Sequence, residues 1–167
     1  MIEIRNAALA DLPAIAAVQH LCYDEHFLES HESFHSKLTA TATTCWLALR
    51  NDKTLGYLIT LPVSTATFPA LDAPAFEICA RPELLYIHDL AITPEGRAFG
   101  LGKQLLECAQ QTAIARAIPR AGLIAVQASA DYWTRHGFVP VDASARGLSE
   151  KVASFGDDAC YMEKSLR

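Results

Sequence analysis

The sequence predicts an α+β domain with α/β character, in which a sheet carries helices on both faces. Strand-like and helix-like segments are mixed along the chain instead of forming separate halves. Residues 83–128 run from an apolar strand through a glycine turn and a helix to a second strand, which is the pattern of a strand–helix–strand unit. With 167 residues, 51% hydrophobic and 20% charged, the chain is expected to form one domain over residues 1–167.

The N-terminal segment predicts a strand followed by two helices. IEIRNA, residues 2–7, alternates apolar and polar residues as a short strand does. A helix is expected next, with Asp11 as its cap and Pro13 in its first turn. A weaker helix is expected over residues 30–42, with Phe34 on its buried side.

A hairpin and a long loop are expected to follow. CWLALR and TLGYLITLPV are apolar runs separated by Asn51–Lys53, which is a hairpin signal, and Gly56 is a candidate bulge. Residues 64–82 hold three prolines and have little periodicity. A loop of this length in a compact domain often serves as a lid or binding wall.

The second half predicts the remaining strands and helices, bounded by proline and glycine. They are a strand over Glu83–Ile92, a helix from the glycine turn to about Ile118, a strand over 122–128, a short helix within 129–138 that Gly137 closes, and final strands over 138–141 and 159–166.

Composition excludes several function classes. The net charge of −5 disfavours a general nucleic-acid or acidic-membrane surface. The five cysteines are odd in number and widely spaced, without C-x-x-C, so no disulfide framework or zinc site is expected. The histidines of the first two predicted helices lack a metal-binding motif, so no metal is expected. No signal peptide or membrane span is visible, and a soluble cytoplasmic protein is expected.

The stretch TPEGRAFGLGKQLL, Thr93–Leu106, predicts an anion site at the start of a helix. It fits neither G-x-x-x-x-G-K-[ST] nor G-x-G-x-x-G, but it contains R-x-x-G-x-G from Arg97 to Gly102. Glycine lets a ligand approach the backbone, and the first amides of a helix are unpaired. With the helix dipole and the charges of Arg97 and Lys103, these amides suit a pyrophosphate.

These motifs resemble those of the GNAT acetyltransferase superfamily. LAITPEGRAFGLGKQLL is similar to its core strand–turn–helix motif, SADYWTRHGF to its later F-Y-x-K-x-G-F helix, and ACYMEKSL to its closing strand. The N-terminal order of elements also matches, so the resemblance covers nearly the whole chain. It implies a mixed, mostly antiparallel sheet of six to seven strands flanked by about four helices.

The resemblance also implies where acetyl-CoA binds. The strand Leu90–Ile92 would splay from its neighbour and offer backbone groups to the pantetheine arm. The amides after Arg97 would hold the pyrophosphate, and Trp133 would line the channel. The implied cofactor-binding residues are Leu90, Ala91, Ile92, Arg97, Ala98, Phe99, Gly100, Leu101, Gly102, Lys103 and Trp133.

His88 is the candidate base for removing a proton from an amine, which is mostly protonated at pH 7. Strand alternation would place Tyr86, His88 and Leu90 on one face and Asp89 on the other. His-Asp-Leu-Ala-Ile resembles H-x-L-A-V of the arylalkylamine N-acetyltransferases, in which the matching histidine is a proposed base. Here the earlier histidine of the His-x-His pair is replaced by Tyr86. A buried, hydrogen-bonded histidine is the alternative.

The general acid is less clearly indicated. The superfamily's usual acid is the tyrosine of F-Y-x-K-x-G-F, and Trp133 takes that position. An indole N–H donates a hydrogen bond but is no practical acid. Tyr132 precedes it and is the candidate acid, although adjacent helix residues point about 100° apart and core packing is the alternative. Water or the attacking amine could also supply the proton.

The acceptor site is expected to involve aromatic residues of the N-terminal helices. Tyr23, Phe27 and Phe34 lie where the superfamily builds its acceptor wall, and Tyr86 is a further candidate. Simple helix packing is the alternative for them, and an exposed face is the default for Glu25, Glu29 and Glu32.

The predicted function is direct transfer of acetyl from acetyl-CoA to a primary amine of a small molecule. A protein N-terminus or lysine as acceptor, and a non-catalytic acyl-CoA sensor, are the alternatives. No nucleic-acid or membrane partner is expected, and a homodimer is one arrangement that the resemblance allows.

Overall fold

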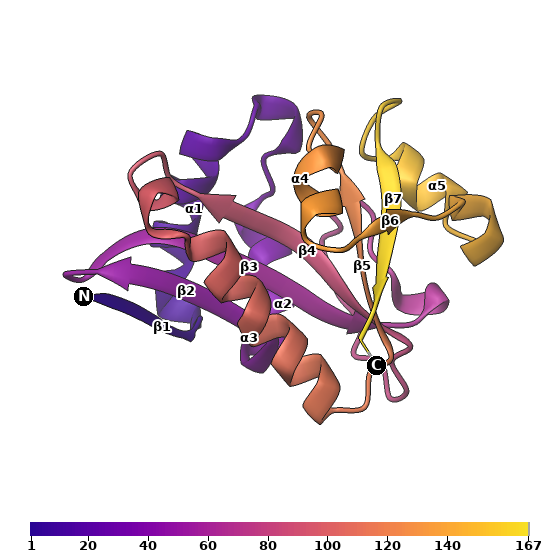
Figure 1. Ribbon diagram of the computed structural model, residues 1–167, viewed down its shortest axis with the longest axis horizontal. Coiled ribbons are helices and arrows are strands. Elements are labelled where there is room, and N and C mark those ends of the chain that lie inside the picture. The colour runs from indigo at the N-terminus through magenta and orange to yellow at the C-terminus, as the bar shows by residue number, and fades with distance from the viewer. Residues whose placement is uncertain (167) are drawn as a thin grey trace.

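Seven strands form one open sheet in a computed structural model that describes residues 1–166 (Figure 1). The strand order is β1, β2, β3, β4, β5, β7, β6, and only β4 and β5 are parallel. The predicted α+β class with a mixed, mostly antiparallel sheet is therefore confirmed, while Arg167, the last residue of the predicted domain, lies outside the described residues. The strands are β1 (Ile2–Asn6), β2 (Cys45–Arg50), β3 (Lys53–Val63), β4 (Leu84–Ile92), β5 (Arg120–Ala125), β6 (Val139–Pro140) and β7 (Cys160–Ser165).

Helices cover both faces of this sheet, as Figure 1 shows. The helices are α1 (Leu12–Cys22), α2 (His31–Thr41), α3 (Leu101–Ala115), α4 (Ala130–Arg135) and α5 (Ser149–Ala153). Buried residues of α1, α2 and α5 join one core cluster, and those of α3 and α4 join a second cluster on the opposite face. We call these the α1/α2 face and the α3/α4 face.

Several predicted boundaries change in the structure. The helix expected to reach Ile118 ends at Ala115, where the chain turns through Ala117 at φ 57°. Asp11 precedes α1, but its carboxylate accepts from the Ala8 amide at 2.8 Å and does not cap the helix. The helix α5 was not predicted, because five residues are too few to display an apolar period.

The predicted hairpin is present, with its bulge one residue from the expected position. Asn51 and Asp52 have φ 50° and 64°, as a two-residue turn between twisted strands requires. The bulge places Leu55, not Gly56, as the extra residue, since Ala48 pairs with Gly56 and the next β2 residue pairs with Thr54.

The loop of residues 64–82 is largely irregular, as predicted, and is fastened to its surroundings. The backbone amides of Leu71 and Phe76 donate to side chains of Ser154 and Ser36, at 3.2 and 2.7 Å. Asp72 accepts from the Ser30 amide at 2.8 Å. The loop therefore connects the two sides of the α1/α2 face.

The sheet opens between β4 and β5. The two parallel strands pair only from Leu85–Ala121 to Ile87–Leu123 and then diverge (Figure 1). Of the last five residues of β4, His88 has no β3 partner and the other four keep theirs, while none of the five pairs with β5 in the described chain. Within residues 1–166, no helix has the length and apolar character needed to cross a membrane.

Candidate active site

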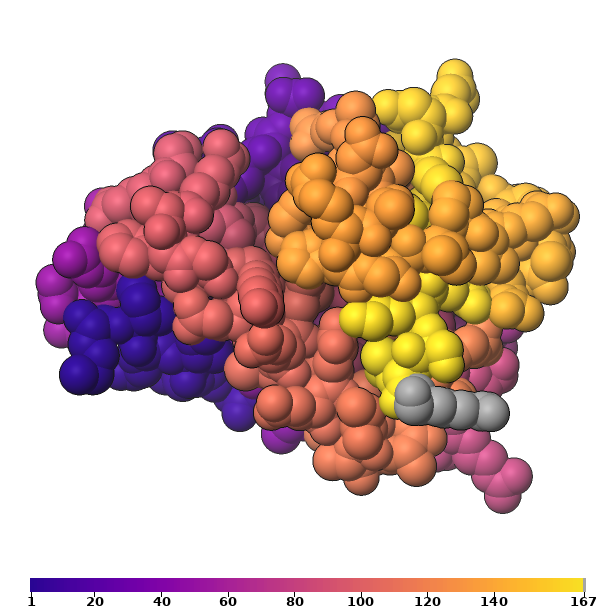
Figure 2. Space-filling model, in the orientation of Figure 1, coloured from indigo at the N-terminus to yellow at the C-terminus, as the bar shows by residue number. Residues whose placement is uncertain are grey.

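A cavity of about 610 Å³ follows the gap between β4 and β5 and crosses the sheet. Figure 2 shows the surface hollowed between the segment that begins α3 and the segment that carries α4. On the α3/α4 face the cavity is lined by Leu101, Gly102, Lys103, Tyr132, Trp133 and His136. On the α1/α2 face it is lined by Tyr23, Phe27, Glu29, Leu71, Val126 and Phe155. One continuous space thus joins the predicted cofactor turn to the predicted acceptor wall.

The glycine turn presents free backbone amides to this cavity. Gly100 precedes α3 at φ 64°, and no described side chain caps the first turn of the helix. A Cβ at Gly100 would meet no protein atom within 4 Å, so the turn borders open space. Arg97 and Lys103 also line the cavity, and their charges add to the dipole at the start of α3. This end of the cavity suits an anion.

Tyr132 and Trp133 both border the cavity, but they differ in burial and in neighbours. Trp133 is 8% exposed, packs at 5.6 Å against the Phe138 ring, and still borders the cavity. Tyr132 is half-buried, and its hydroxyl lies so near Gly102 that a Cβ there would be 2.5 Å away. Burial raises the pKa of Tyr132, so its hydroxyl stays protonated. Tyr132 therefore places a protonated hydroxyl beside the glycine turn.

A bulge at His88 alters the faces of β4. The residues on either side of His88 pair with adjacent residues of β3, so His88 is the extra residue. The His88 side chain contacts Tyr86, and Asp89 accepts from Tyr57, both on the α1/α2 face. Leu90 packs on the α3/α4 face. The prediction that Asp89 points away from His88, and that Leu90 shares its face, is therefore wrong, because a bulge directs two successive side chains the same way.

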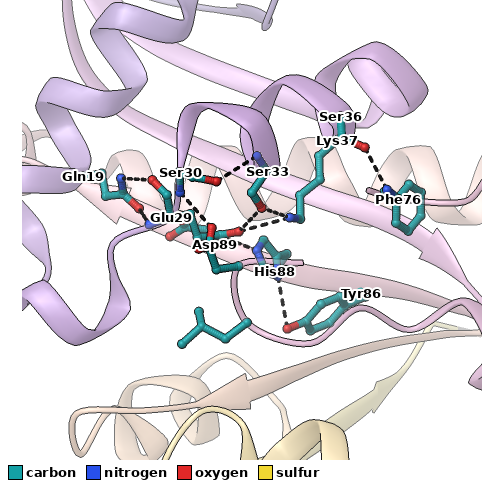
Figure 3. Close-up of polar contacts among 12 residues, drawn as sticks. Gln19, Glu29, Ser30, Ser33, Ser36, Lys37, Phe76, Tyr86, His88 and Asp89 are labelled. Carbon is teal, nitrogen blue, oxygen red and sulfur yellow. Dashed lines mark hydrogen bonds and ion pairs between the residues drawn. The ribbon is translucent and has the colours of Figure 1, made fainter. Parts of the chain in front are cut away.

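The His88 ring is enclosed and engaged at both nitrogens. Its side chain is 1% exposed, its Nε2 contacts the Glu29 carboxylate, and its Nδ1 lies 3.2 Å from the Tyr86 hydroxyl (Figure 3). The Tyr86 hydroxyl has no other partner among the described residues. We therefore assign Nδ1 as the acceptor and Nε2–H as the donor. In this geometry the ring has no free lone pair for a substrate.

Glu29 is buried, which corrects the expectation of an exposed acidic face. It holds the bond to His88 on Oε1, and on Oε2 it accepts from Ser33 at 2.7 Å and Lys37 at 3.0 Å (Figure 3). Gln19 of α1 fixes the Glu29 backbone through its amide group. Burial alone would raise the pKa of Glu29, but His88, Lys37 and Ser33 outweigh it and lower that pKa. Glu29 is an ionised anchor of the network.

Asp89 lines the cavity beside this network but is incompletely satisfied. Its Oδ2 accepts from the Tyr57 hydroxyl at 2.6 Å, whereas Oδ1 is buried without a hydrogen-bond partner among residues 1–166. Burial, reinforced by the charge of Glu29, raises the pKa of Asp89 to about 6. Buried polar atoms without a partner are rare in proteins, so this oxygen needs an explanation.

Some predicted site residues lie away from the cavity. Phe34 is 2% exposed and packs edge-to-face on Tyr57 in the core, and Tyr86 is fully buried against Phe68. Neither can form part of an acceptor wall in this geometry, because packing occupies their faces. Ala91, Ala98 and Phe99 also do not border the cavity, whereas the other predicted cofactor residues, Tyr23 and Phe27 do.

The sequence reasoning missed several cavity residues. Cys22 donates to the Ile92 carbonyl at 3.3 Å, next to the predicted residue Tyr23, whose hydroxyl donates to the Leu90 carbonyl at 2.9 Å. The His136 ring lies tilted against the Tyr132 ring with their centroids 4.6 Å apart, and burial and neighbouring cations lower the pKa of His136. The spacing of four between Glu29, Ser33 and Lys37 was the available signal for the buried network.

Comparisons with known proteins identify the same architecture. The acetyltransferase (GNAT) family model matches residues 5–138. A search of curated protein sequences finds no match. The chain is similar to the crystal structure of the loading GNATL domain of CurA from Lyngbya majuscula, at 13% identity and TM-score 0.79, over 99% of this chain and 98% of that one.

Two further similar structures differ from each other in their named activity. PaiA N-acetyltransferase from Thermoplasma acidophilum, in complex with coenzyme A, has 18% identity and TM-score 0.70, over 99% of each chain. The GphF GNAT-like decarboxylase, in complex with isobutyryl-CoA, has 16% identity and TM-score 0.78, over 99% of this chain and 100% of that one. Identities this low establish the fold and not the reaction.

Proposed function

The chain belongs to the acetyltransferase (GNAT) family, and from that premise we propose that it transfers acetyl from acetyl-CoA to the primary amine of a small molecule. The transfer is direct, within a ternary complex. The observation that carries this proposal is the set of uncapped amides at the start of α3, which open into the cavity beside Arg97 and Lys103. They suit the pyrophosphate of coenzyme A.

The geometry of the gap supports the rest of the cofactor site. The Leu90–Ile92 segment has no β5 partner among the described residues, and Tyr23 and Cys22 donate to its Leu90 and Ile92 carbonyls, so the pantetheine arm would pair with the backbone groups that remain. The acetyl group would then lie within the gap, and Phe27 on the α1/α2 face would border the acceptor. Tyr132 would donate to the cofactor near the turn, so the thiolate would take its proton from the amine or from solvent.

The role proposed for His88 changes with its hydrogen bonds. Direct removal of a proton would require its Nε2 to leave Glu29. His88 is better suited to hold the bulge in shape and to connect β4 with the α1–α2 segment. His88→Ala is therefore expected to lower the rate through misplacement of β4 backbone groups.

Two other functions compete with this proposal. A sensor module on the same fold is favoured by Trp133 at the usual tyrosine position, and a protein N-terminus or lysine could be the acceptor. Turnover of acetyl-CoA, followed as free thiol with a panel of small amines and peptides, separates them. Binding of coenzyme A with no turnover on any amine would support the sensor. We also retain a cytoplasmic location and a homodimer as predictions.

The cofactor site is tested with a matched pair of glycine variants. Gly100 and Gly147 have φ 64° and 68°, and a Cβ would have room at each. Valine therefore strains the backbone equally at both, but only Gly100 borders the cavity. Gly100→Val is expected to weaken coenzyme A binding roughly tenfold or more in calorimetry, because hydrogen bonds to a charged pyrophosphate are lost.

Gly147→Val is expected to bind coenzyme A as the parent does, although both variants lose stability. Equal affinity in Gly100→Val and the parent would show that the glycine turn does not hold the cofactor. Equal weakening in both variants would assign the effect to backbone strain alone.

A further inference from the structure

We propose that Asp89 binds the ammonium group of the acceptor and takes its proton, and that the acceptor carries this group on a small apolar body. This inference rests on the proposed function and names its substrate class and its proton acceptor. It is carried by a shortage of hydrogen-bond donors, by an uncompensated charge, and by the apolar wall around Asp89.

The donor shortage lies where β4 leaves β5. Three acceptors, the two Asp89 carboxylate oxygens and the Leu90 carbonyl, face only two hydroxyl donors, those of Tyr57 and Tyr23. Tyr23 lies close enough to interact with Asp89 as well, but it has one hydroxyl proton and donates it to Leu90 at 2.9 Å. One of the three acceptors therefore lacks a donor, whether Tyr23 donates to the Leu90 carbonyl or to Asp89. An ammonium group brings three N–H donors to this point.

The Asp89 carboxylate also forms no ion pair with any side chain of residues 1–166. Glu29 has both oxygens occupied and is neutralised by Lys37, which is fully buried. His88 directs Nε2 to Glu29 and Nδ1 to Tyr86, so neither ring nitrogen contacts Asp89. The negative charge of Asp89 therefore has no partner of its own within the described chain, and a buried charge without a partner is costly.

Asp89 is suited to receive a proton as well as to bind a cation. Burial, then the charge of Glu29, raise the pKa of Asp89 to about 6, and contacts with His88, Tyr57 and Tyr23 offset part of that rise. The carboxylate is therefore ionised at pH 7.5 but is more basic than usual. In a site of low dielectric, an amine and a carboxylic acid are favoured over the ion pair more than they are in water.

The reaction then balances as follows. One N–H bond of the ammonium breaks and an O–H bond forms on Asp89, which leaves a neutral amine. Its nitrogen attacks the acetyl carbonyl carbon, the C–N bond forms, and the C–S bond breaks. The second proton from nitrogen goes to the thiolate of coenzyme A, and the Asp89 proton goes to solvent.

The wall around Asp89 sets the rest of the acceptor. On the α1/α2 face the cavity is bordered by Phe27, Leu71, Ile124, Val126 and Phe155. These side chains offer no hydrogen bonds to a second polar group, and the polar residue Gln127, which also borders the cavity, already donates to Asp24. The acceptor is therefore expected to be a monoamine with an apolar body, since a second charge would be desolvated without a partner.

The test measures binding to the protein saturated with coenzyme A, by calorimetry at pH 7.5 and pH 5.0. The probes are n-butylamine and 1-butanol, which match in size and differ in charge. The variants are Asp89→Asn and, as a matched control, Asp24→Asn. Asp24 is an exposed carboxylate that accepts from the cavity residue Gln127 at 3.0 Å, so its loss removes the same charge from the cavity rim.

At pH 7.5 the parent is expected to bind n-butylamine at least tenfold more tightly than 1-butanol. Asp89→Asn is expected to abolish this preference and to leave coenzyme A binding intact, whereas Asp24→Asn retains the preference. In the parent, the preference is expected to fall about tenfold or more at pH 5.0, where Asp89 is protonated. This pH arm tests the proposal even if Asp89→Asn does not fold.

A parent that shows no preference, a preference unchanged at pH 5.0, or equal loss in the two variants would each overturn the proposal. Its failure is distinct from failure of the proposed function. Cation binding at Asp89 without acetyl transfer to any amine would reject the proposed transferase function and support the cation site at Asp89. Acetyl transfer that is unaffected by Asp89→Asn would support the proposed function and reject the role of Asp89.

Discussion

At the scale of single residues, the bulge at His88 decides the chemistry of the site. Simple alternation along β4 would send Asp89 to the α3/α4 face, among the side chains of the second core. The extra residue instead brings His88 and Asp89 to the same face, where Glu29 engages one and Tyr57 the other. The sequence identified His88 but not the bulge, because no glycine or proline marks it.

Asp89→Asn is expected to stabilise the free protein in a pH-dependent way. The pKa of Asp89 is raised from 3.8 to about 6 on folding, so the folded protein binds this proton more tightly than the unfolded chain. Its contribution is therefore favourable at low pH and is lost as pH rises through this window, at a cost of about 3 kcal/mol above pH 6. The asparagine side chain is not ionised in the folded protein or in the unfolded chain, so the variant does not have this cost.

The measurement is urea unfolding of the parent and of Asp89→Asn at pH 4.5 and pH 8. The advantage of the variant should be larger at pH 8 by about 2 kcal/mol. An advantage of equal size at both pH values would mean that Asp89 does not titrate in this range.

At the scale of elements, the buried ion pair joins α2 and the segment before it to β4. Glu29 is held by Gln19 of α1, accepts from Lys37 of α2, and contacts His88 of β4, so three elements meet at one carboxylate. The order and type of the main elements could be predicted, since strand alternation and helical periods are local. The contacts of Glu29 could not be, because its partners are brought together only when the helices pack on the sheet.

Glu29→Gln is expected to destabilise the protein by about 3–5 kcal/mol, because it leaves the Lys37 ammonium buried without a counter-charge. Adding Lys37→Met should recover a large part of this loss, since the double variant buries neither charge. The free energy of unfolding of the two single variants and the double variant measures this coupling.

The control is the exposed ion pair between Lys53 and Glu95, in which the side chains are 66% and 46% exposed. Glu95→Gln should cost less than about 1 kcal/mol. If Glu29→Gln cost no more than Glu95→Gln, the buried pair would contribute nothing to the attachment of α2.

At the scale of the whole molecule, the cavity crosses the sheet, so the proposed function has the two substrates approach from opposite faces. The proposed cofactor end lies at α3 and α4, and the proposed acceptor end lies at Tyr23 and Phe155. The residues proposed for the cofactor end could be named from the sequence, because a glycine turn before a helix is a local signal. The acceptor end combines loops that are distant in sequence, such as residues 24–30 and 64–82, and depends on packing that no local pattern contains.

This arrangement predicts direct transfer, with both substrates bound together in the gap. The thiol that borders the gap, Cys22, donates to the Ile92 carbonyl, and burial raises its pKa, so it is a weak nucleophile at neutral pH. Initial rates measured at several concentrations of acetyl-CoA and amine should give intersecting double-reciprocal lines. Protein incubated with acetyl-CoA alone should gain no acetyl mass on Cys22. Parallel lines together with an acetylated Cys22 would instead establish a covalent intermediate, and the gap would then serve one substrate at a time.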